Sequence, residues 1–508
     1  AEVNYEDNTV SRYTRENFSF AGTWKSGVSD ITGDNAIFQK IKNSQWELKN
    51  HFNQLYTKEK YTWGIRLYIR YTHCPASLTV AHRNLPILFA DNMLIANCIY
   101  HRNELSSPDN ISENTYRTVI GQTHESILAE YEEMNTGNAY TDNVLYGMRK
   151  INGVNYQLTG GFCGELSSVK QENAYSAHSY SFYTVPRIEW ERNDFLFTAA
   201  TTVRWSHLPK QSYSRFCVSP FFCFRYKFTP RWKMSLLGSL DESEGGLKDI
   251  YPFRYREDYR TVVKHTGKVP VTVRQLYTCY LEYKNTIKEF FWTLSASYSH
   301  NRYNLITERN YKDGNFYLSS VERNHSSHSY TLNTIGSKGI YDWNLKTSLE
   351  LTLARNEGKQ LNEGIVQDYR YDYLCIEPKI VWAPSVFFEA EYKATVSCVG
   401  GGIGEDTSLD PLWEVAQRLT LSLEFHDTEF RLSGEHFYND LSKNQHLNIW
   451  LADVSLIHKV GKWRFAASAI NLFNKEQYRY TLYSAVQSYT SWIKLRPREF
   501  MVSVQYQW

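Results

Sequence analysis

The dominant pattern along the chain is an alternation of apolar and polar residues with a period of two. Residues 61–71 carry Tyr, Trp, Ile and Leu at the odd positions, with Thr and Arg at several even ones. The same alternation recurs over 195–205, 290–298, 343–353 and 419–425. Successive side chains of a strand point to opposite faces, so this period predicts strands with one apolar and one polar face. No segment of comparable length shows a helical period, and the chain is predicted to be all-β.

The last ten residues, EFMVSVQYQW, show the alternation most clearly. Most soluble domains leave their final residues loose, so a large aromatic as the last residue requires something to bury or anchor it. We interpret this segment as the strand that closes a barrel by pairing with the first strand, since closure removes both sheet edges. Its apolar positions are Phe500, Val502, Val504, Tyr506 and Trp508.

The connections between predicted strands alternate between short and long. Short ones, such as Thr229-Pro230-Arg231, have the composition of tight hairpins. Longer ones include 240–268 and 399–412. This rhythm is typical of an up-and-down antiparallel transmembrane β-barrel with short periplasmic turns and long extracellular loops.

Counting on this rhythm predicts about 22 strands, with the least certain boundaries over 85–150. The first strand is expected near 12–26, after a lead-in over 1–11, so that 12–508 is one barrel. An even strand number would place both chain ends on the periplasmic side.

Aromatic residues bracket the apolar face of several predicted strands. Ten strand steps of about 3.3 Å, tilted by about 40°, project to roughly 25 Å, the height of a barrel's apolar band. A soluble sandwich or propeller would also alternate, but it needs neither aromatics at both ends of an outward face nor strands of this length. The predicted aromatic girdle comprises Tyr61, Trp63, Tyr71, Phe195, Trp205, Trp292, Tyr298 and Trp343.

Composition narrows the class of protein further. A net charge of +2 argues against a nucleic-acid-binding groove. No stretch approaches the about 18 continuous apolar residues of a membrane helix, whereas alternation hides a membrane barrel from hydropathy averages. The eight cysteines lie scattered in strand-like runs without a CxxC pair, so we interpret them as small apolar fillers. No cofactor or metal ion is predicted.

The C-terminal segments ASAINLFNKEQYRY and LRPREFMVSVQYQW resemble the last two strands of TonB-dependent outer-membrane transporters, in the style abundant in Bacteroidota. That family shows an Asn-Leu-Phe followed by a Tyr, then a Pro-Arg-x-Phe that enters a final strand with a terminal aromatic. The matching positions are Asn471, Leu472, Phe473, Tyr478, Pro497, Arg498, Phe500 and Trp508.

The resemblance implies an outer-membrane barrel that imports a nutrient, energised by TonB through a plug domain. The predicted first strand lies close to Ala1, so no plug is expected in this sequence. Three explanations stay open: a trimmed chain, a plug on a separate chain, or a plugless relative filled by a partner.

Few segments suggest chemistry. VGGGIGED (399–406) lacks the Lys-Ser/Thr of a phosphate loop and is interpreted as a flexible outer loop. His325 and His328 would face opposite sides of a strand and so could not share a metal ion. No nucleophile triad or catalytic carboxylate pair stands out, and an outer-membrane hydrolase is not favoured.

The most ligand-like feature is the predicted loop 240–268, where aromatic residues alternate with arginines. Such side chains suit sugars, peptides or anions, although a packed loop or a contact with a partner lipoprotein would use them equally. The residues are Tyr251, Phe253, Arg254, Tyr255, Arg256, Tyr259 and Arg260.

Two functions remain. The first is a TonB-dependent-transporter-like importer, which would contact TonB only if a plug exists elsewhere. The second is a plugless, non-transporting barrel that acts as a scaffold in a larger outer-membrane complex. Both place the chain in the outer membrane of a Gram-negative bacterium, among its lipids, with periplasmic termini and plausible contacts to a surface lipoprotein or other complex subunits.

Overall fold

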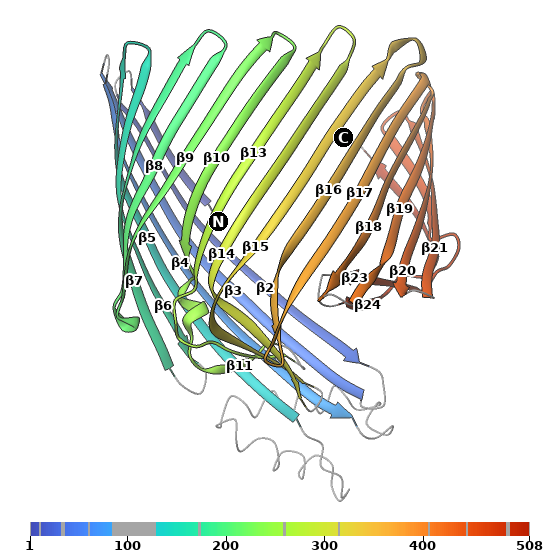
Figure 1. Cartoon of the computed structure of the whole chain (residues 1–508). Coiled ribbons are helices and arrows are strands. Elements are labelled where there is room, and N and C mark those ends of the chain that lie inside the picture. The colour runs from blue at the N-terminus through green and yellow to red at the C-terminus, as the bar shows by residue number, and fades with distance from the viewer. Residues whose placement is uncertain are drawn as a thin grey trace, which may run out of the picture.

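The computed structural model describes residues 2–9, 12–31, 36–58, 61–83, 129–170, 174–257, 261–312, 315–404, 407–442, 445–483 and 488–506. Nearly all of them lie in long antiparallel strands that curl into a barrel wall, with tight turns at one end and longer connections at the other (Figure 1). The all-β, up-and-down prediction is confirmed. Within the described residues, no helix is long and apolar enough to cross a membrane.

Each wall strand pairs with the next along the chain, β10 pairs with β13, and β22 pairs with β25. The wall strands are β1 (Glu2–Asn8), β2 (Arg12–Ile31), β3 (Ala36–Lys58), β4 (Tyr61–Arg83), β5 (Ala129–Ile151), β6 (Val154–Lys170), β7 (Ala174–Arg192), β8 (Phe195–Leu208), β9 (Tyr213–Thr229), β10 (Trp232–Glu244), β13 (Val271–Asn285), β14 (Phe290–Lys312), β15 (Asn315–Ile340), β16 (Leu345–Asn362), β17 (Ile365–Ser385), β18 (Phe388–Ile403), β19 (Thr407–Phe425), β20 (Thr428–Ser442), β21 (Gln445–Val460), β22 (Trp463–Ile470) and β25 (Glu499–Tyr506).

Within the described residues, the connections contain four more strands and three short 3-10 helices. These are η3 (Pro209–Gln211), η4 (Leu247–Ile250), β11 (Arg254–Arg256), β12 (Thr261–Lys264), η5 (Tyr341–Trp343), β23 (Gln477–Tyr483) and β24 (Ser488–Lys494).

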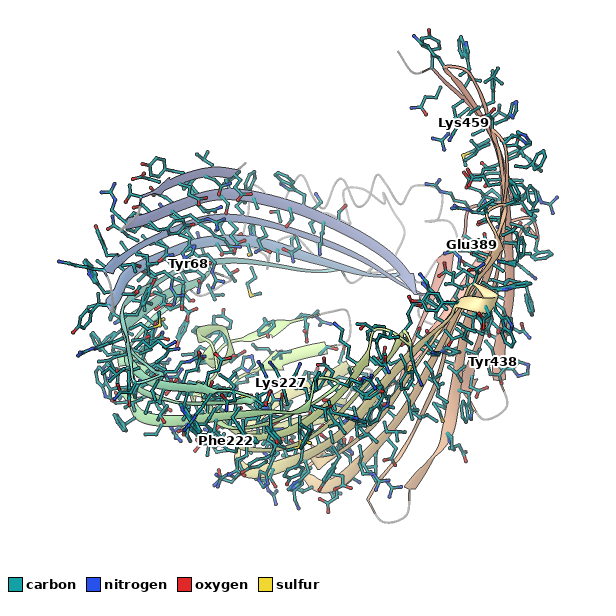
Figure 2. The ribbon with its side chains drawn as sticks, turned by 90° about the horizontal axis from the view of Figure 1, so that it is seen from above. Tyr68, Phe222, Lys227, Glu389, Tyr438 and Lys459 are labelled. Atoms are coloured by element: carbon teal, nitrogen blue, oxygen red, sulfur yellow. The ribbon has the colours of Figure 1, made fainter. Side chains whose placement is uncertain are left out.

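The two ends of the sheet differ from the sequence expectation. Of the 25 described strands, β11, β12, β23 and β24 lie in connections, which leaves 21 in the wall. The segment expected as a lead-in forms β1, which pairs with β2 from Glu2↔Ser19 to Asn8↔Tyr13. Because the count is odd, β1 and β25 both run toward the tight-turn end. No pairing of described residues joins them, and the last strands extend away from the curve (Figure 2).

The strands are longer than predicted at the end with the longer connections. The glycine run expected as a flexible loop continues β18, and β15 reaches 26 residues. Residues 308–317 and 356–368, where the alternation is lost, are likewise mostly strand. The correction has a simple physical reason: above the apolar band both faces of a strand meet water, so the alternation that marks the strand disappears.

The outer face of the wall is apolar and exposed. On β4 the exposed apolar side chains are all at odd positions, and β8 and β16 behave alike. On β9, Phe222 and Lys227 lie on opposite sides of the wall, outside and inside the curve respectively (Figure 2). An exposed apolar band around a polar interior is the arrangement of a barrel surrounded by lipid.

Some inner-face aromatic rings lie flat over glycines of the neighbouring strand. A Cβ on Gly161 would lie 2.3 Å from Cζ of Tyr183, whose hydroxyl donates a hydrogen bond to Asp142 at 2.8 Å. Gly64 makes the same room for Tyr146. Covering a strand glycine in this way excludes water from backbone that lacks its own side chain, and it keeps the lumen open.

We predict that an arginine is tolerated on the inner face of β16 and not on its outer face. Leu349 lies outward and is 51% exposed, whereas its neighbour Ser348 points inward. Leu349→Arg would lose about 2–4 kcal/mol of unfolding free energy in lipid, because it places a cation in hydrocarbon. Ser348→Arg would change the unfolding free energy little. Urea titration of both variants in bilayers checks this, and equal effects would contradict a lipid-facing outer wall.

Candidate functional site

The inner face of β13–β16 carries many hydroxyl and amide side chains. On β14, serines occupy three successive inward positions, and Ser297 bonds the Thr278 hydroxyl at 3.1 Å. Further along, the Asn301 amide donates to Ser327 at 3.3 Å. Such side chains cannot face hydrocarbon, so this face is solvated by water or by a polar ligand.

A hollow of about 560 Å³ opens on this inner wall below the longer connections. Asp241 and Arg274 lie directly opposite in the β10–β13 register, which places both charges at the same rim. Tyr303 and Tyr369 supply aromatic hydroxyls on the far side. The hollow therefore offers both charge signs, hydroxyls and ring faces to a polar solute; sequence reasoning named none of these residues.

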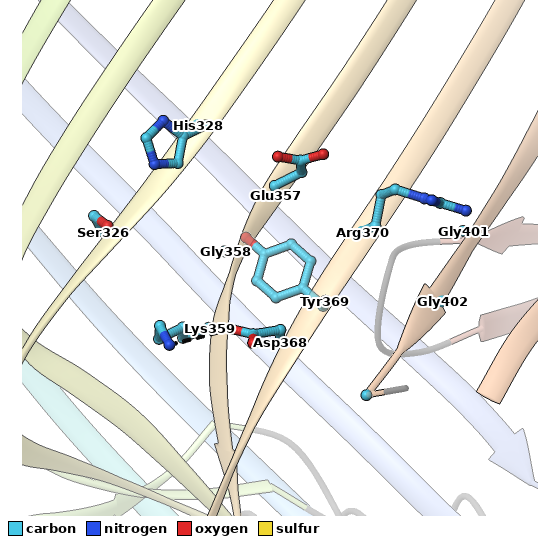
Figure 3. A pocket seen from close by; sticks show the side chains of 11 residues that line it. Ser326, His328, Glu357, Gly358, Lys359, Asp368, Tyr369, Arg370, Gly401 and Gly402 are labelled. Atoms are coloured by element: carbon cyan, nitrogen blue, oxygen red, sulfur yellow. Dashed lines mark ion pairs between the residues drawn. The ribbon is translucent and has the colours of Figure 1, made fainter. Parts of the chain in front are cut away.

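A second pocket lies at the end of β15–β18 that carries the longer connections (Figure 3). Two ion pairs lie here: Lys359 is 3.3 Å from Asp368, and the guanidinium of Arg370 is 3.1 Å from Asp372, just beyond the pocket lining. The side chains of Lys359, Asp368 and Arg370 are about half exposed or more, and that of Asp372 is 33% exposed, so each pair contributes little stability. The imidazole of His328 bonds Tyr298, whereas His325 stacks on Tyr303 of the opposite face. We interpret this region as a hydrated rim above the apolar band.

The predicted ligand loop folds back against the inner wall. Tyr251 is 2% exposed and packs with Ile250 against Tyr175 of β7. Phe253 and Tyr255 surround the Tyr251 ring, at centroid distances of 5.4 and 6.3 Å. These aromatics therefore form the loop's own small core. Tyr251 is not available to a ligand, and Phe253 is partly exposed.

The arginines of the loop lie at its β11–β12 end. The guanidinium of Arg254 stacks over the ring of Tyr317 at 5.2 Å. Arg256 pairs in register with Val262 across the β11–β12 hairpin. Tyr259 and Arg260 lie outside the described residues. The structure thus brings the loop aromatics together and sends Arg254 to a different strand, β15.

Asn304 fixes the exit of the loop. Its side-chain amide donates to the Val269 carbonyl at 2.9 Å, and its oxygen accepts from the Val271 backbone N–H at 2.7 Å. Asn304 sits at a register shift between Tyr303 and Leu305, so its side chain replaces a backbone pairing partner. Beyond the shift the two strands of the β14–β15 hairpin exchange neighbours. There β15 pairs in parallel with β12, and β14 pairs in parallel with β16. A break in the alternation was the only sequence signal for this anchor.

His265 lies in the packed part of the same loop. Its Nδ1 lies 3.3 Å from the Ser320 hydroxyl, and its ring lies 6.1 Å from that of Tyr255. Burial lowers the pKa of His265, against the opposing pull of Asp249 and Glu257. Burial also raises the pKa of Tyr255. Both groups are therefore held neutral in the docked loop.

The family-motif positions have a structural explanation in Asn471. This residue has a left-handed backbone (φ 54°), and its backbone N–H donates to Asp453 at 2.8 Å. Its side-chain amide donates to the carbonyls of Lys475 and Arg496, and its oxygen accepts from the Lys475 backbone. Asn471 thus ties the start of the last connection to its end.

The remaining motif positions surround this tie. The Arg498 backbone donates to Asn474 at 2.9 Å, which fixes the entry to β25 just after Pro497. Leu472 donates its backbone N–H to Ala452, and Phe473 is exposed. Tyr478 belongs to β23, and the structure describes only its backbone.

The structure describes all of the predicted girdle residues and most of those predicted for the closing strand. Tyr61, Trp63, Tyr71, Phe195 and Trp205 are exposed on the outer face, and Trp343 is exposed in the η5 turn. Trp292 and Tyr298 have the outward parity of β14 but are partly covered, and the Trp292 indole donates to Thr334. On β25, the exposed apolar residues of one parity are Phe500, Val502, Val504 and Tyr506; Trp508 lies outside the described residues. That these rings mark the bilayer surfaces, and that β25 closes the barrel, stay predictions.

No family model and no curated protein matches the chain. Three solved structures are similar in outline. The ferric yersiniabactin uptake receptor of Yersinia pestis is 10% identical over 99% of this chain and 77% of its own, with a TM-score of 0.37. A mutant ferric enterobactin receptor of Pseudomonas aeruginosa is 12% identical over 99% and 76%, with a TM-score of 0.42. A copper transporter is 9% identical over 98% and 82%, with a TM-score of 0.41. At these scores the fold assignment rests on the strand pairing itself.

We predict that docking of the loop weakens as the pH falls. The folded pKa of His265 lies below its ordinary value of 6.5, so the undocked loop binds the proton more readily. The stability gained from docking is therefore complete above 6.5 and declines as the pH falls through that value toward the lowered pKa. Hydrogen exchange of residues 245–257 and 261–270 between pH 7.5 and 5 measures this. His265→Gln should flatten the dependence, and an unchanged slope would contradict it.

Replacing Asn471 by glycine should destabilise the last connection. Glycine keeps the left-handed backbone but removes three side-chain hydrogen bonds, each worth about 0.5–1.5 kcal/mol. We expect a loss of about 2–4 kcal/mol in unfolding free energy. Asn474→Gly is the matched control, because Asn474 also has a left-handed backbone but its side chain accepts a single hydrogen bond, from Arg498. Equal losses in urea titrations of the two variants would refute the assignment.

Proposed function

We propose that the chain is the wall of an outer-membrane transport barrel that imports a polar nutrient too large for porins. One observation carries the proposal: an exposed apolar outer face encloses an inner wall of hydroxyl, amide and charged groups that ends in the Asp241–Arg274 hollow. A barrel of this width cannot fill its bore with its own side chains, so the bore holds water, solute or another polypeptide.

The direction of import follows from the position of the folded-back loop. The loop and the hollow lie at the end with the longer connections, which in such barrels faces the cell exterior. A solute would therefore meet the charged rim first. Energy would come from TonB through a plug, as the C-terminal motif resemblance implies, and the tight-turn end, toward which β25 runs, would face the periplasm.

A second candidate is a scaffold that transports nothing and assembles with other outer-membrane subunits; the wide polar bore supports it, because another polypeptide could fill that bore. The two candidates differ in whether the lumenal side chains matter for activity.

The test is a chromosomal deletion complemented with variants and scored by uptake across a panel of labelled sugars, peptides and metal chelates. For an importer, deletion abolishes uptake of at least one compound. Arg274→Ala then lowers its initial uptake rate several-fold, because the rim loses its cation. Tyr277→Phe, on the outer face of the same strand, should leave uptake unchanged at equal membrane abundance. Unchanged uptake of every compound, with loss of surface proteins from the deletion strain, would refute import and support the scaffold.

A further inference from the structure

On the outer face of β14–β18, apolar side chains give way to charged ones between two neighbouring rows of paired residues. The first row has the outward parity of Leu349 on β16 and consists of Ala296, Leu332, Leu353, Leu374 and Cys398. The next outward row, toward the longer connections, consists of Tyr298, Tyr330, Arg355, Asp372 and Gly400. Tyrosines and charged side chains mark the boundary between hydrocarbon and water. The apolar band of the wall therefore ends between these two rows.

A hollow of about 800 Å³ opens at this boundary, and we call it the outer groove. The apolar row from Ala296 to Cys398 lines one side of it, and the other side is lined by Tyr330, Arg355, Arg370 and Asp372. Its volume lies within the range of pockets that hold small molecules, about 300–1,000 Å³. The outer groove thus combines an apolar floor with a charged rim, as the two ends of an amphipathic molecule require.

Gly400 leaves the outer groove open on β18. A Cβ at this position would meet nothing closer than the Cα of Pro411, 4.0 Å away. The pairing of β18 with β19 shifts register between Val399 and Gly401, so Gly400 has no partner in the described β18–β19 pairing. Gly400 pairs with Asp372 on its other side, where a larger side chain would fill the space beside the carboxylate.

The rim of the outer groove carries an excess of positive charge. Arg355 and Arg370 share one carboxylate, and their Nε atoms lie 2.6 and 3.1 Å from the two oxygens of Asp372. Two guanidiniums against one carboxylate leave one positive charge in excess among the side chains that line the groove. Each guanidinium has five N–H donors, more than Asp372 alone can accept from the pair. Both arginine side chains are about half exposed, so the remaining donors are available to an anion.

A further carboxylate, that of Glu357, lies on the water side of this rim. Glu357 pairs in register with Arg370, but it lines the adjoining pocket and not the outer groove (Figure 3). Water and salt screen a charge at such a position more strongly than one beside hydrocarbon. Glu357 therefore leaves the rim of the outer groove cationic.

We propose that the outer groove binds a lipid with a phosphate head group, in the leaflet on the side of the longer connections. The phosphate oxygens accept hydrogen bonds from Arg355 and Arg370, whose forked donors match phosphate geometry. An acyl chain lies along the apolar row. Lipid is the occupant because it surrounds the outer wall, and because the change from apolar to cationic side chains follows the change from acyl chain to phosphate along one lipid molecule. The proposal requires a wall embedded in a membrane but not transport, so its failure would leave the import proposal untouched.

Native mass spectrometry of the whole chain, folded in detergent micelles, measures how tightly each added lipid binds. The probes are dioleoyl phosphatidic acid and dioleoyl phosphatidylcholine, with inorganic phosphate as a competitor. We expect phosphatidic acid to bind at least about tenfold more tightly than phosphatidylcholine, the scale of one hydrogen bond to a charged group. Inorganic phosphate should not displace it, because the acyl chain contributes to binding.

Arg355→Gln tests the head-group contact. It should weaken the binding of phosphatidic acid about tenfold, because the phosphate loses one of its two cations. Lys359→Gln is the matched control and should leave binding unchanged. Lys359 is an outward cation of the same strand, 48% exposed, and does not line the outer groove.

Gly400→Leu tests the acyl-chain contact, because the new side chain would fill the open space beside Asp372. It should weaken the binding of phosphatidic acid at least about tenfold, since the chain loses apolar contact area. Gly434→Leu is the matched control and should bind the lipid normally. Gly434 pairs with the exposed Leu419 on the outer face of β20, and a Cβ there would also meet open space. Heat-shifted gel mobility verifies folding of each variant.

The proposal is overturned if the two lipids bind equally, if inorganic phosphate displaces phosphatidic acid, or if Arg355→Gln binds as the unmodified chain does. Equal binding by Gly400→Leu and Gly434→Leu would overturn the acyl-chain contact and with it the proposal. A polypeptide that copurifies from native membranes in place of lipid, and is lost from Arg355→Gln, would overturn it as well.

Discussion

Every wall strand must satisfy its backbone hydrogen bonds through its neighbours, because hydrocarbon provides neither donors nor acceptors. This constraint explains why the chain forms one continuous meander and why each strand pairs with the next. It also decides where side chains go. Once the backbone is committed to lateral pairing, alternate side chains have only two destinations, the lipid and the lumen, and the chemistry of the two faces separates completely.

The same constraint helps to explain the side chains that depart from the alternation of apolar and polar positions. On the outer face of β3, polar Asn50 and Gln54 alternate with apolar Leu48 and Phe52, and they hydrogen-bond Glu16 and Thr14 of β2. At the opposite face, the loop aromatics around Tyr251 bury themselves against β7 instead of lining a ligand groove. In both places the side chains that depart from the simple alternation find partners within the chain.

The face of each strand could be predicted from sequence because lipid imposes a strict rule on one parity, as Leu349 and Phe222 illustrate. The strand ends could not, because outside the band no such rule applies and the glycines of β18 read as a loop. The roles of Asn304 and Arg274 could not be predicted from sequence for another reason. Asn304 acts through the carbonyl and N–H of residues far away in sequence, and the role of Arg274 depends on register with Asp241. Sequence spacing records neither relationship.

The exchange of neighbours at the tip of the β14–β15 hairpin limits which insertions and deletions the protein tolerates there. Beyond Asn304 the two strands exchange sides, so β15 is held by β12 and β14 by β16 at the same time. Inserting or deleting one codon in either arm would invert which face every later side chain of the tip presents, against two partners at once. Homologues are therefore expected to vary in tip length by even steps, or to lose the exchange altogether.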